Sequence, residues 1–93
     1  MTRLLATYPS SHAALRAERD LLERGLAVEL VPVPRQVRAD CGFCLLADAP
    51  EADAAFQERL ETLRASGARE LWRVASRPGG PGPRKENSYE RIP

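Results

Sequence analysis

The sequence predicts an α+β domain in which two helices cover one face of a four-stranded antiparallel sheet. Three observations support this fold: four short apolar runs suited to strands, two amphipathic segments suited to helices, and their order, β-α-β-β-α-β. A chain of 93 residues is long enough for one modest core and too short for two. All six elements fall within residues 1–76, and this order in so short a segment favours a ferredoxin-like βαββαβ sandwich.

The first strand is expected at residues 3–8, where an apolar run ends at Pro9. Ser10 and Ser11 follow as N-cap candidates, because a serine oxygen can accept an unpaired N–H of the first helical turn. The first helix is expected over residues 12–25, because Gly25 is a residue type that commonly terminates helices. The residues predicted to share its apolar face are Ala14, Leu15, Leu21 and Leu22.

The second strand is expected at residues 27–33, where two prolines favour an edge position or a strand end. The third is expected at residues 43–49. A second helix follows over residues 51–67, with Pro50 suited to its first turn. Its predicted apolar stripe consists of Ala52, Ala55, Phe56, Leu60 and Leu63. The fourth strand is expected at residues 69–76, with Trp72 as a core residue.

The composition changes at Arg77, after which prolines and glycines become frequent. A segment with so little apolar surface cannot offset the entropy of ordering its backbone. Residues 77–93 are therefore predicted to form a flexible tail outside the domain. Deleting residues 79–93 is accordingly expected to change the free energy of unfolding by less than about 1 kcal/mol.

Composition also excludes several classes of protein. With 43% apolar and 29% charged residues, the chain has the composition of a soluble globular protein. No apolar run approaches the roughly 20 residues of a membrane helix, and the first residues do not resemble a signal peptide. A net charge of +1 gives no electrostatic reason to expect a nucleic-acid partner. We therefore expect a cytoplasmic protein with no membrane partner and no cofactor.

The two cysteines of the chain, Cys41 and Cys44, form a C-x-x-C motif that runs from a loop into the third strand. This placement makes them unequal. Cys41 is the candidate reactive thiol, while Cys44 is a candidate small core residue, a candidate resolving thiol, and the thiol expected to be more buried. The alternative is that both thiols are inert.

The predicted topology brings the start of the first helix and the loop before the third strand to the same end of the sheet. The residues gathered there as a candidate site are Ser10, Ser11, His12, Arg35, Arg38, Cys41, Gly42 and Cys44. Arg35 and the helix N-terminus would favour the thiolate of Cys41, so its pKa is expected to lie below the roughly 8.5 of a free cysteine. Asp40 would oppose this shift. For each arginine and for His12, an ordinary solvated side chain is the alternative.

A tetrahedral zinc site is a weaker interpretation of the same motif. Zinc needs four ligands, and one C-x-x-C offers two. His12 and Asp40 could complete the set, but nothing in their spacing requires it. No metal site is predicted.

Residues 8–48 resemble the selenium/sulfur-carrier-like family of small bacterial domains. The matching elements are Ser11-His12-Ala13-Ala14-Leu15, Ala17-Glu18, the G-x-x-V-x-L-V-P-x-P-R segment at residues 25–35, and Cys41-Gly42. The resemblance implies that Cys41 is a carrier thiol, with Arg35 and His12 close by. The sequence departs from the family pattern at Cys44, where many members have an apolar residue, and in the C-terminal segment.

Three hypotheses for function follow. In the first, the protein is a non-enzymatic carrier whose Cys41 takes sulfur or selenium from a donor protein and passes it to an acceptor protein. In the second, it is a thiol–disulfide redox protein that uses Cys41 and Cys44 as a pair. In the third, it is a regulatory module that binds an anion or a protein, and its cysteines are passive.

Overall fold

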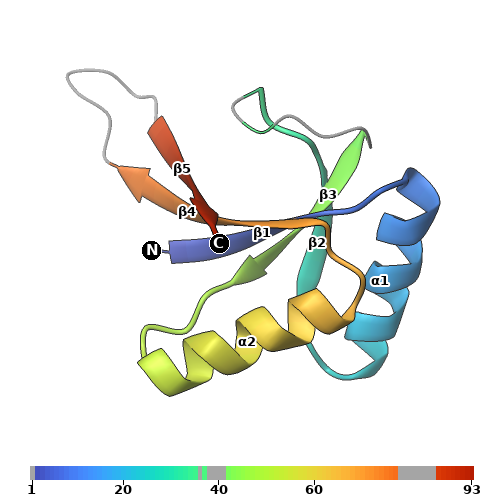
Figure 1. Ribbon diagram of the computed structural model, residues 1–93, viewed down its shortest axis with the longest axis horizontal. Coiled ribbons are helices and arrows are strands. Elements are labelled where there is room, and N and C mark those ends of the chain that lie inside the picture. The colour runs from blue at the N-terminus through green and yellow to red at the C-terminus, as the bar shows by residue number, and fades with distance from the viewer. Residues whose placement is uncertain (1, 36, 38–41, 78–85) are drawn as a thin grey trace.

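A computed structural model describes residues 2–35, 37, 42–77 and 86–93 (Figure 1). The elements are β1 (Thr2–Thr7), α1 (Ser11–Glu23), β2 (Val28–Pro32), β3 (Phe43–Asp48), α2 (Asp53–Ala65), β4 (Glu70–Arg77) and β5 (Glu86–Ile92). The strands form one sheet in the order β2-β3-β1-β4-β5, and all neighbouring strands are antiparallel. Both helices lie on one face of this sheet (Figure 1). Neither helix has the length and hydrophobicity needed to span a lipid bilayer.

The sheet has five strands, so the prediction of four is wrong. The additional strand, β5, comes from the segment at residues 77–93 for which composition predicted a flexible tail. It pairs with β4 from Leu71 opposite Ile92 to Arg77 opposite Glu86. The prolines and glycines of this segment lie before β5 and at Pro93, and the strand itself, ENSYERI, has neither. Averaging the composition over the whole segment concealed a seven-residue strand.

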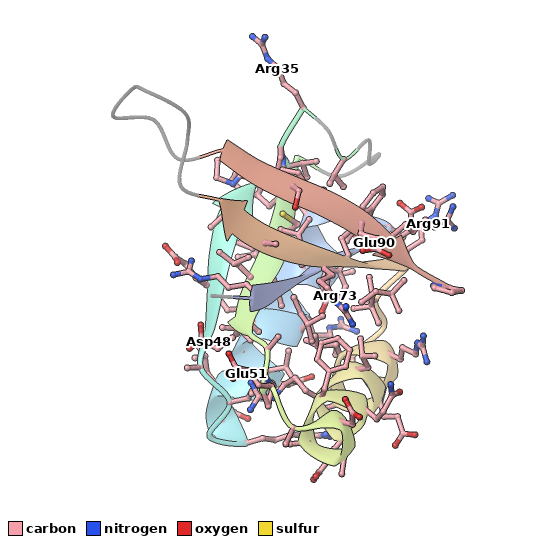
Figure 2. The ribbon with its side chains drawn as sticks, turned by 90° about the vertical axis from the view of Figure 1, so that its left-hand side faces the viewer. Arg35, Asp48, Glu51, Arg73, Glu90 and Arg91 are labelled. Atoms are coloured by element: carbon pink, nitrogen blue, oxygen red, sulfur yellow. The ribbon has the colours of Figure 1, made fainter. Side chains whose placement is uncertain are left out.

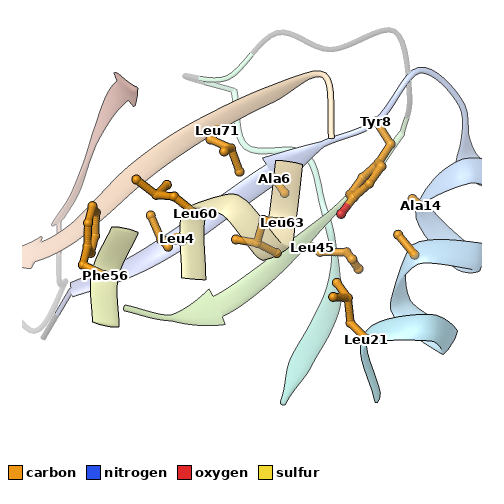
Figure 3. Close-up of a cluster of buried hydrophobic side chains, with 11 residues drawn as sticks. Leu4, Ala6, Tyr8, Ala14, Leu21, Leu45, Phe56, Leu60, Leu63 and Leu71 are labelled. Carbon is orange, nitrogen blue, oxygen red and sulfur yellow. The ribbon is translucent and has the colours of Figure 1, made fainter. Parts of the chain in front are cut away.

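The core between the sheet and the helices is built on the central strand β1 (Figure 3). Its buried members are Leu4, Ala6, Tyr8, Ala14, Ala17, Leu21, Leu45, Phe56, Leu60, Leu63 and Leu71. Leu4 and Leu45 are 0% and 1% exposed. Burying a leucine side chain fully contributes about 1.5–3 kcal/mol relative to leaving it in water. These contacts are therefore the main reason that both helices lie against the sheet.

Helix α1 begins as predicted, because the Ser10 side chain caps it by accepting a hydrogen bond from the Ala13 N–H at 3.1 Å. Gly25 follows its end with φ of 84°, a conformation that favours glycine. The predicted apolar face is only partly correct: Leu15 and Leu22 are 51% and 50% exposed. The helix is rotated so that a narrower stripe faces the sheet, and its buried members are Ala14, Ala17 and Leu21.

Helix α2 begins at Asp53, later than predicted, and Pro50 precedes it. Its N-cap residue, Ala52, provides no side-chain hydrogen bond. The buried stripe nevertheless includes Phe56, Leu60 and Leu63, as the helical spacing predicted. The start of this helix is thus specified by packing rather than by a capping side chain.

Tyr8 connects the end of β1 to the end of α2. The residue is 1% exposed, and its hydroxyl lies 2.7 Å from Ser66 Oγ. Ser66 donates its hydroxyl proton to the Leu63 carbonyl, so Tyr8 donates to Ser66. Burial raises the pKa of Tyr8 above its ordinary value because it penalises the phenolate, and the hydrogen bond to Ser66 opposes this effect.

Replacing Tyr8 with phenylalanine should lower stability by about 1 kcal/mol at neutral pH, through loss of this hydrogen bond. It should also remove an alkaline destabilisation. Because the folded-state pKa of Tyr8 is raised, its contribution is fully present below the unfolded pKa of about 10 and is lost as pH rises through the folded value. Urea unfolding at neutral and alkaline pH measures the loss of stability in wild type and in Tyr8→Phe. Tyr89→Phe is the control. An equal pH dependence in wild type and Tyr8→Phe would contradict it.

Deleting residues 86–93 should lower the free energy of unfolding by about 2 kcal/mol or more, which replaces the expectation from composition of less than about 1 kcal/mol. The deletion removes the partly buried Tyr89 and Ile92 from the two apolar clusters and leaves the edge of β4 unpaired. Glu90→Ala is the matched control, because this β5 side chain is exposed and its removal should change stability by less than about 0.5 kcal/mol. Denaturant unfolding compares the three proteins. A deletion that is as stable as wild type would show that β5 contributes nothing to the fold.

Candidate functional site

Cys44 lies in β3, on the face of the sheet opposite α1 and α2, which we call the helix-free face. It is 0% exposed and is present as a buried thiol. Its Sγ donates a weak hydrogen bond to the Val31 carbonyl oxygen at 3.6 Å, on the neighbouring strand. The structure thus confirms that Cys44 is buried within the sheet, with its side chain on the face opposite that of Leu45.

A second apolar cluster covers the centre of the helix-free face. Its buried members are Leu5, Val37, Cys44 and Val74, and the partly buried residues packed against them are Val31, Val33, Leu46, Trp72 and Tyr89. Trp72, predicted as a core residue, therefore belongs to this cluster and is only partly buried. Both faces of the sheet are apolar at their centres.

The segment that follows β2 folds back over this cluster. The Val33 N–H donates to the Gly42 carbonyl at 3.2 Å, which closes the base of the loop. The Val37 N–H donates to the Pro34 carbonyl at 3.0 Å, which forms a turn. Val37 is only 1% exposed and belongs to the same buried cluster as Cys44. The loop that joins β2 to β3 is therefore anchored at Val37, within this cluster.

Thr7 is the polar neighbour of Cys44 on the helix-free face. The two residues are opposite one another in the β1–β3 pairing. Thr7 is 1% exposed, and within the described part of the chain its Oγ1 has no hydrogen-bond partner. A buried hydroxyl without a partner costs about 1–3 kcal/mol. The sequence provides no signal for this buried hydroxyl, because a threonine in a predicted strand is ordinary.

The ends of three strands meet where the candidate site was predicted. Cys44, near the start of β3, is paired with Thr7 at the end of β1 and with Val31 near the end of β2. The N-terminus of α1 follows β1 directly, and the loop that carries the C-x-x-C motif leads into β3. The pairing of β1, β2 and β3 therefore places the start of α1 and the loop before β3 at the same end of the sheet.

The predicted residues at the start of α1 are exposed. Ser10 uses its side chain as the cap, and Ser11 is the first helical residue. His12 Nε2 lies 3.4 Å from the Arg16 guanidinium on the next turn. A guanidinium can only donate, so this ring nitrogen accepts. The described contacts of His12 are thus within its own helix.

Arg35 and Gly42, the described loop members of the predicted site, are both exposed. Arg35 extends from the outer part of the loop, away from the sheet (Figure 2). An added Cβ at Gly42 would meet no atom within 4 Å, so no close approach requires glycine there. Cys41, Arg38 and Asp40 lie outside the described residues. Among the described residues, no group of three or more His, Cys, Asp or Glu side chains could hold a metal ion.

A cavity of about 240 Å³ lies on the helix-free face between the loop and β5. Pro32 and Pro34 line it on one side and Tyr89 on the other, and Leu5 also lines it. Arg3 also lines it and forms an ion pair with Asp48 at 3.8 Å. The surface beside the cysteine loop is therefore mostly apolar.

A family model described as "Putative Se/S carrier protein-like" matches residues 3–63. This match covers most of the chain and includes both cysteines. The chain belongs to this family. Comparison with curated proteins and with solved structures gives no match.

Membership of the Se/S carrier-like family confirms the resemblance found in the sequence. The match extends from β1 to Leu63 in α2, and it contains the whole loop between β2 and β3. The last two residues of α2, and all of β4 and β5, lie beyond it. The cysteine loop is therefore part of the family pattern, whereas the two C-terminal strands of the sheet lie outside the match.

In native protein, Cys44 should react with an alkylating reagent far more slowly than in urea, because Val37 and the sheet exclude the reagent. Alkylation of Cys41→Ser, followed by mass spectrometry, isolates this thiol. Adding Val37→Ala should accelerate labelling by uncovering it, and Leu22→Ala, at an exposed position, is the control. Native labelling as fast as in urea would contradict the burial.

Proposed function

We propose that this protein is a carrier of sulfur or selenium and that Cys41 is the carrier thiol. The observation that carries the proposal is the family match, which spans the C-x-x-C motif and the Pro-x-Pro-Arg segment before it. The burial of Cys44 supports the assignment, because a carrier thiol must reach a partner protein and Cys44 is fully enclosed. Because a carrier thiol must be accessible to its partners, we assign this role to Cys41 and not to Cys44.

The transfer is an exchange between thiols that requires no external oxidant. The Cys41 thiolate attacks the terminal sulfur of a donor persulfide, R–S–SH. The bond between the two donor sulfurs breaks as a new bond to Cys41 Sγ forms, and the donor leaves as the thiolate R–S⁻. An acceptor thiolate then attacks the terminal sulfur of the Cys41 persulfide and restores the Cys41 thiolate. A donor with a terminal selenium would give a selenosulfide by the same steps.

The other predicted site residues receive supporting roles. Arg35 and Arg38 provide cationic donors for the thiolate and for its anionic cargo. The N-terminus of α1, with Ser10, Ser11 and His12, has the positive end of a helix dipole and no acidic residue in its first turn. Gly42 anchors the base of the loop through its bond with Val33.

As part of this proposal, the protein acts in the cytoplasm with donor and acceptor proteins and is not itself an enzyme. We also propose that residues 2–77 be classified as ferredoxin-like. The support is the order β2-β3-β1-β4 of the first four strands, with both helices on one face. In this classification β5 is an addition at the edge of the sheet.

Incubation with a cysteine desulfurase and cysteine should add the mass of one sulfur atom to wild type and to Cys44→Ala, but not to Cys41→Ser. Intact-mass spectrometry measures the adduct, and a thiol reductant should remove it. Cys44→Ala is the matched control because it leaves Cys41 as the remaining thiol.

Uptake by Cys41→Ser equal to that of wild type, or no uptake by wild type, would refute the carrier assignment. A loss of two hydrogen atoms from wild type, with no sulfur gained, would indicate an intramolecular disulfide. That result would favour the redox hypothesis instead.

A further inference from the structure

Strand β5 forms one edge of the sheet. In the order β2-β3-β1-β4-β5 it pairs with β4 on one side, and no other strand among the described residues pairs with its outer side. Along that outer side, alternate residues of Glu86–Ile92 direct their backbone N–H and C=O groups away from β4. A row of backbone groups of this kind is a template for pairing with a further strand.

The two edges of the sheet differ in how well they can accept a strand. The opposite edge, β2, has five residues and ends at Pro32, which has no backbone N–H to donate. β5 has seven residues, ENSYERI, with no proline and no glycine. β5 is therefore the edge that can form a longer and uninterrupted set of hydrogen bonds.

The middle of β5 presents different side chains on its two faces. Tyr89 lies opposite Val74 of β4 and packs, partly buried, against the apolar cluster of the helix-free face. Ser88 and Glu90 alternate with it, so they lie on the helix side of the sheet, and both are exposed. These residues determine which partner strand fits the edge.

A second copy of β5 fits this edge in an antiparallel arrangement. Opposed residues of antiparallel strands share a face of the sheet, so a two-fold axis that relates two copies must pass through a residue and not between two residues. An axis at Tyr89, the middle residue of the strand, pairs the whole of Glu86–Ile92 with its copy. Tyr89 then lies opposite Tyr89 of the second copy, and Ser88 lies opposite Glu90.

The charges along β5 favour this axis over its neighbours. Moving the axis to Glu90 would place Glu90 opposite its own copy, and moving it to Ser88 would place Glu90 opposite Glu86. Like charges at directly opposed positions are destabilising. With the axis at Tyr89, no residue of the strand lies opposite one of the same charge.

We propose that this protein forms a homodimer in which β5 pairs with β5 of a second copy about a two-fold axis at Tyr89. The two sheets join into one continuous sheet with all helices on the same face. The opposed tyrosine side chains link the apolar clusters of the two helix-free faces, since opposed Cβ atoms lie about 4.5–5.5 Å apart. The proposal does not rest on the carrier function, because neither cysteine belongs to β5.

The size of the contact predicts the strength of the dimer. Pairing confined to one strand per chain belongs to the small end of specific interfaces, below about 1,200 Å². We therefore expect a dimer that dissociates on dilution. Sedimentation velocity over a concentration series that extends into the millimolar range, at low ionic strength, measures its dissociation constant. Wild type that stays monomeric throughout this range would overturn the proposal.

Opposite charges introduced at Ser88 test the register. Ser88→Lys places a cation opposite Glu90 of the second copy, whereas Ser88→Glu places two anions opposite one another. Because the two-fold axis repeats each contact, we expect dimerisation about threefold or more tighter for Ser88→Lys and about threefold or more weaker for Ser88→Glu. Both variants lose the same 3.4 Å hydrogen bond from Ser88 Oγ to the Ala75 carbonyl, so that loss cancels in the comparison. Dissociation constants that change in the same direction in both variants would overturn the register.

A double variant and a control at the opposite edge complete the test. Ser88→Glu combined with Glu90→Lys restores opposite charges at the opposed positions and should return dimerisation at least to the wild-type strength. Glu29→Lys is the control, because this exposed residue lies on β2 and should leave the dissociation constant unchanged. Circular dichroism establishes that each variant is folded. A dimer that Glu29→Lys disrupts, or that the double variant fails to restore, would overturn the proposal.

Discussion

The structure depends on burying β1 on both faces. This strand lies between β3 and β4, so its backbone is paired along both edges. Leu4 and Ala6 face the helices, and Leu5 and Thr7 face the other way, yet all four are buried. A strand with apolar residues on both faces needs a cover on each, because either face left in water would forfeit the hydrophobic contribution of its side chains. Two helices provide one cover, and the loop between β2 and β3 contributes to the other.

This constraint accounts for the burial of Cys44. Val37 contributes to the buried cluster on the helix-free face, and Cys44 belongs to the same cluster. The covering loop is held at its base by the Val33–Gly42 hydrogen bond and near its middle by Val37. The segment between Val37 and Gly42, where the sequence places Cys41, is thus bounded by two anchors.

The C-terminal part of the chain changes the other edge of the sheet. β5 supplies Tyr89 to the apolar cluster on the helix-free face, and its Arg91 lines a cavity together with Arg64 and Arg69. Arg64 reaches the Pro93 carbonyl from α2, so the helix layer and the last strand are joined directly. The strand β5, which lies beyond the family match, therefore packs against residues within it on both faces of the sheet.

Local patterns in the sequence were sufficient for much of this architecture. The helical spacing of Phe56, Leu60 and Leu63 and the cap at Ser10 depend on neighbours a few residues away, and the structure bears both out. The alternation through FCLLAD likewise determined that Cys44 and Leu45 point to opposite faces, because side chains alternate along any strand. Family membership was readable from short motifs around the cysteines.

Tertiary structure decided the features that depend on distant partners. Which leucines of α1 are buried depends on how the helix is rotated against the sheet, so Leu15 and Leu22 could not be assigned from periodicity alone. β5 gains its ladder hydrogen bonds only by pairing with β4. A polar strand of seven residues has no local sequence pattern strong enough to predict this pairing. The burial of Val37 with Leu5 and Val74, and the meeting of Arg64, Arg69 and Arg91 in one cavity, arise from contacts between segments far apart in the chain. Such contacts form only when the whole sheet is assembled, which is why no local pattern in the sequence contained them.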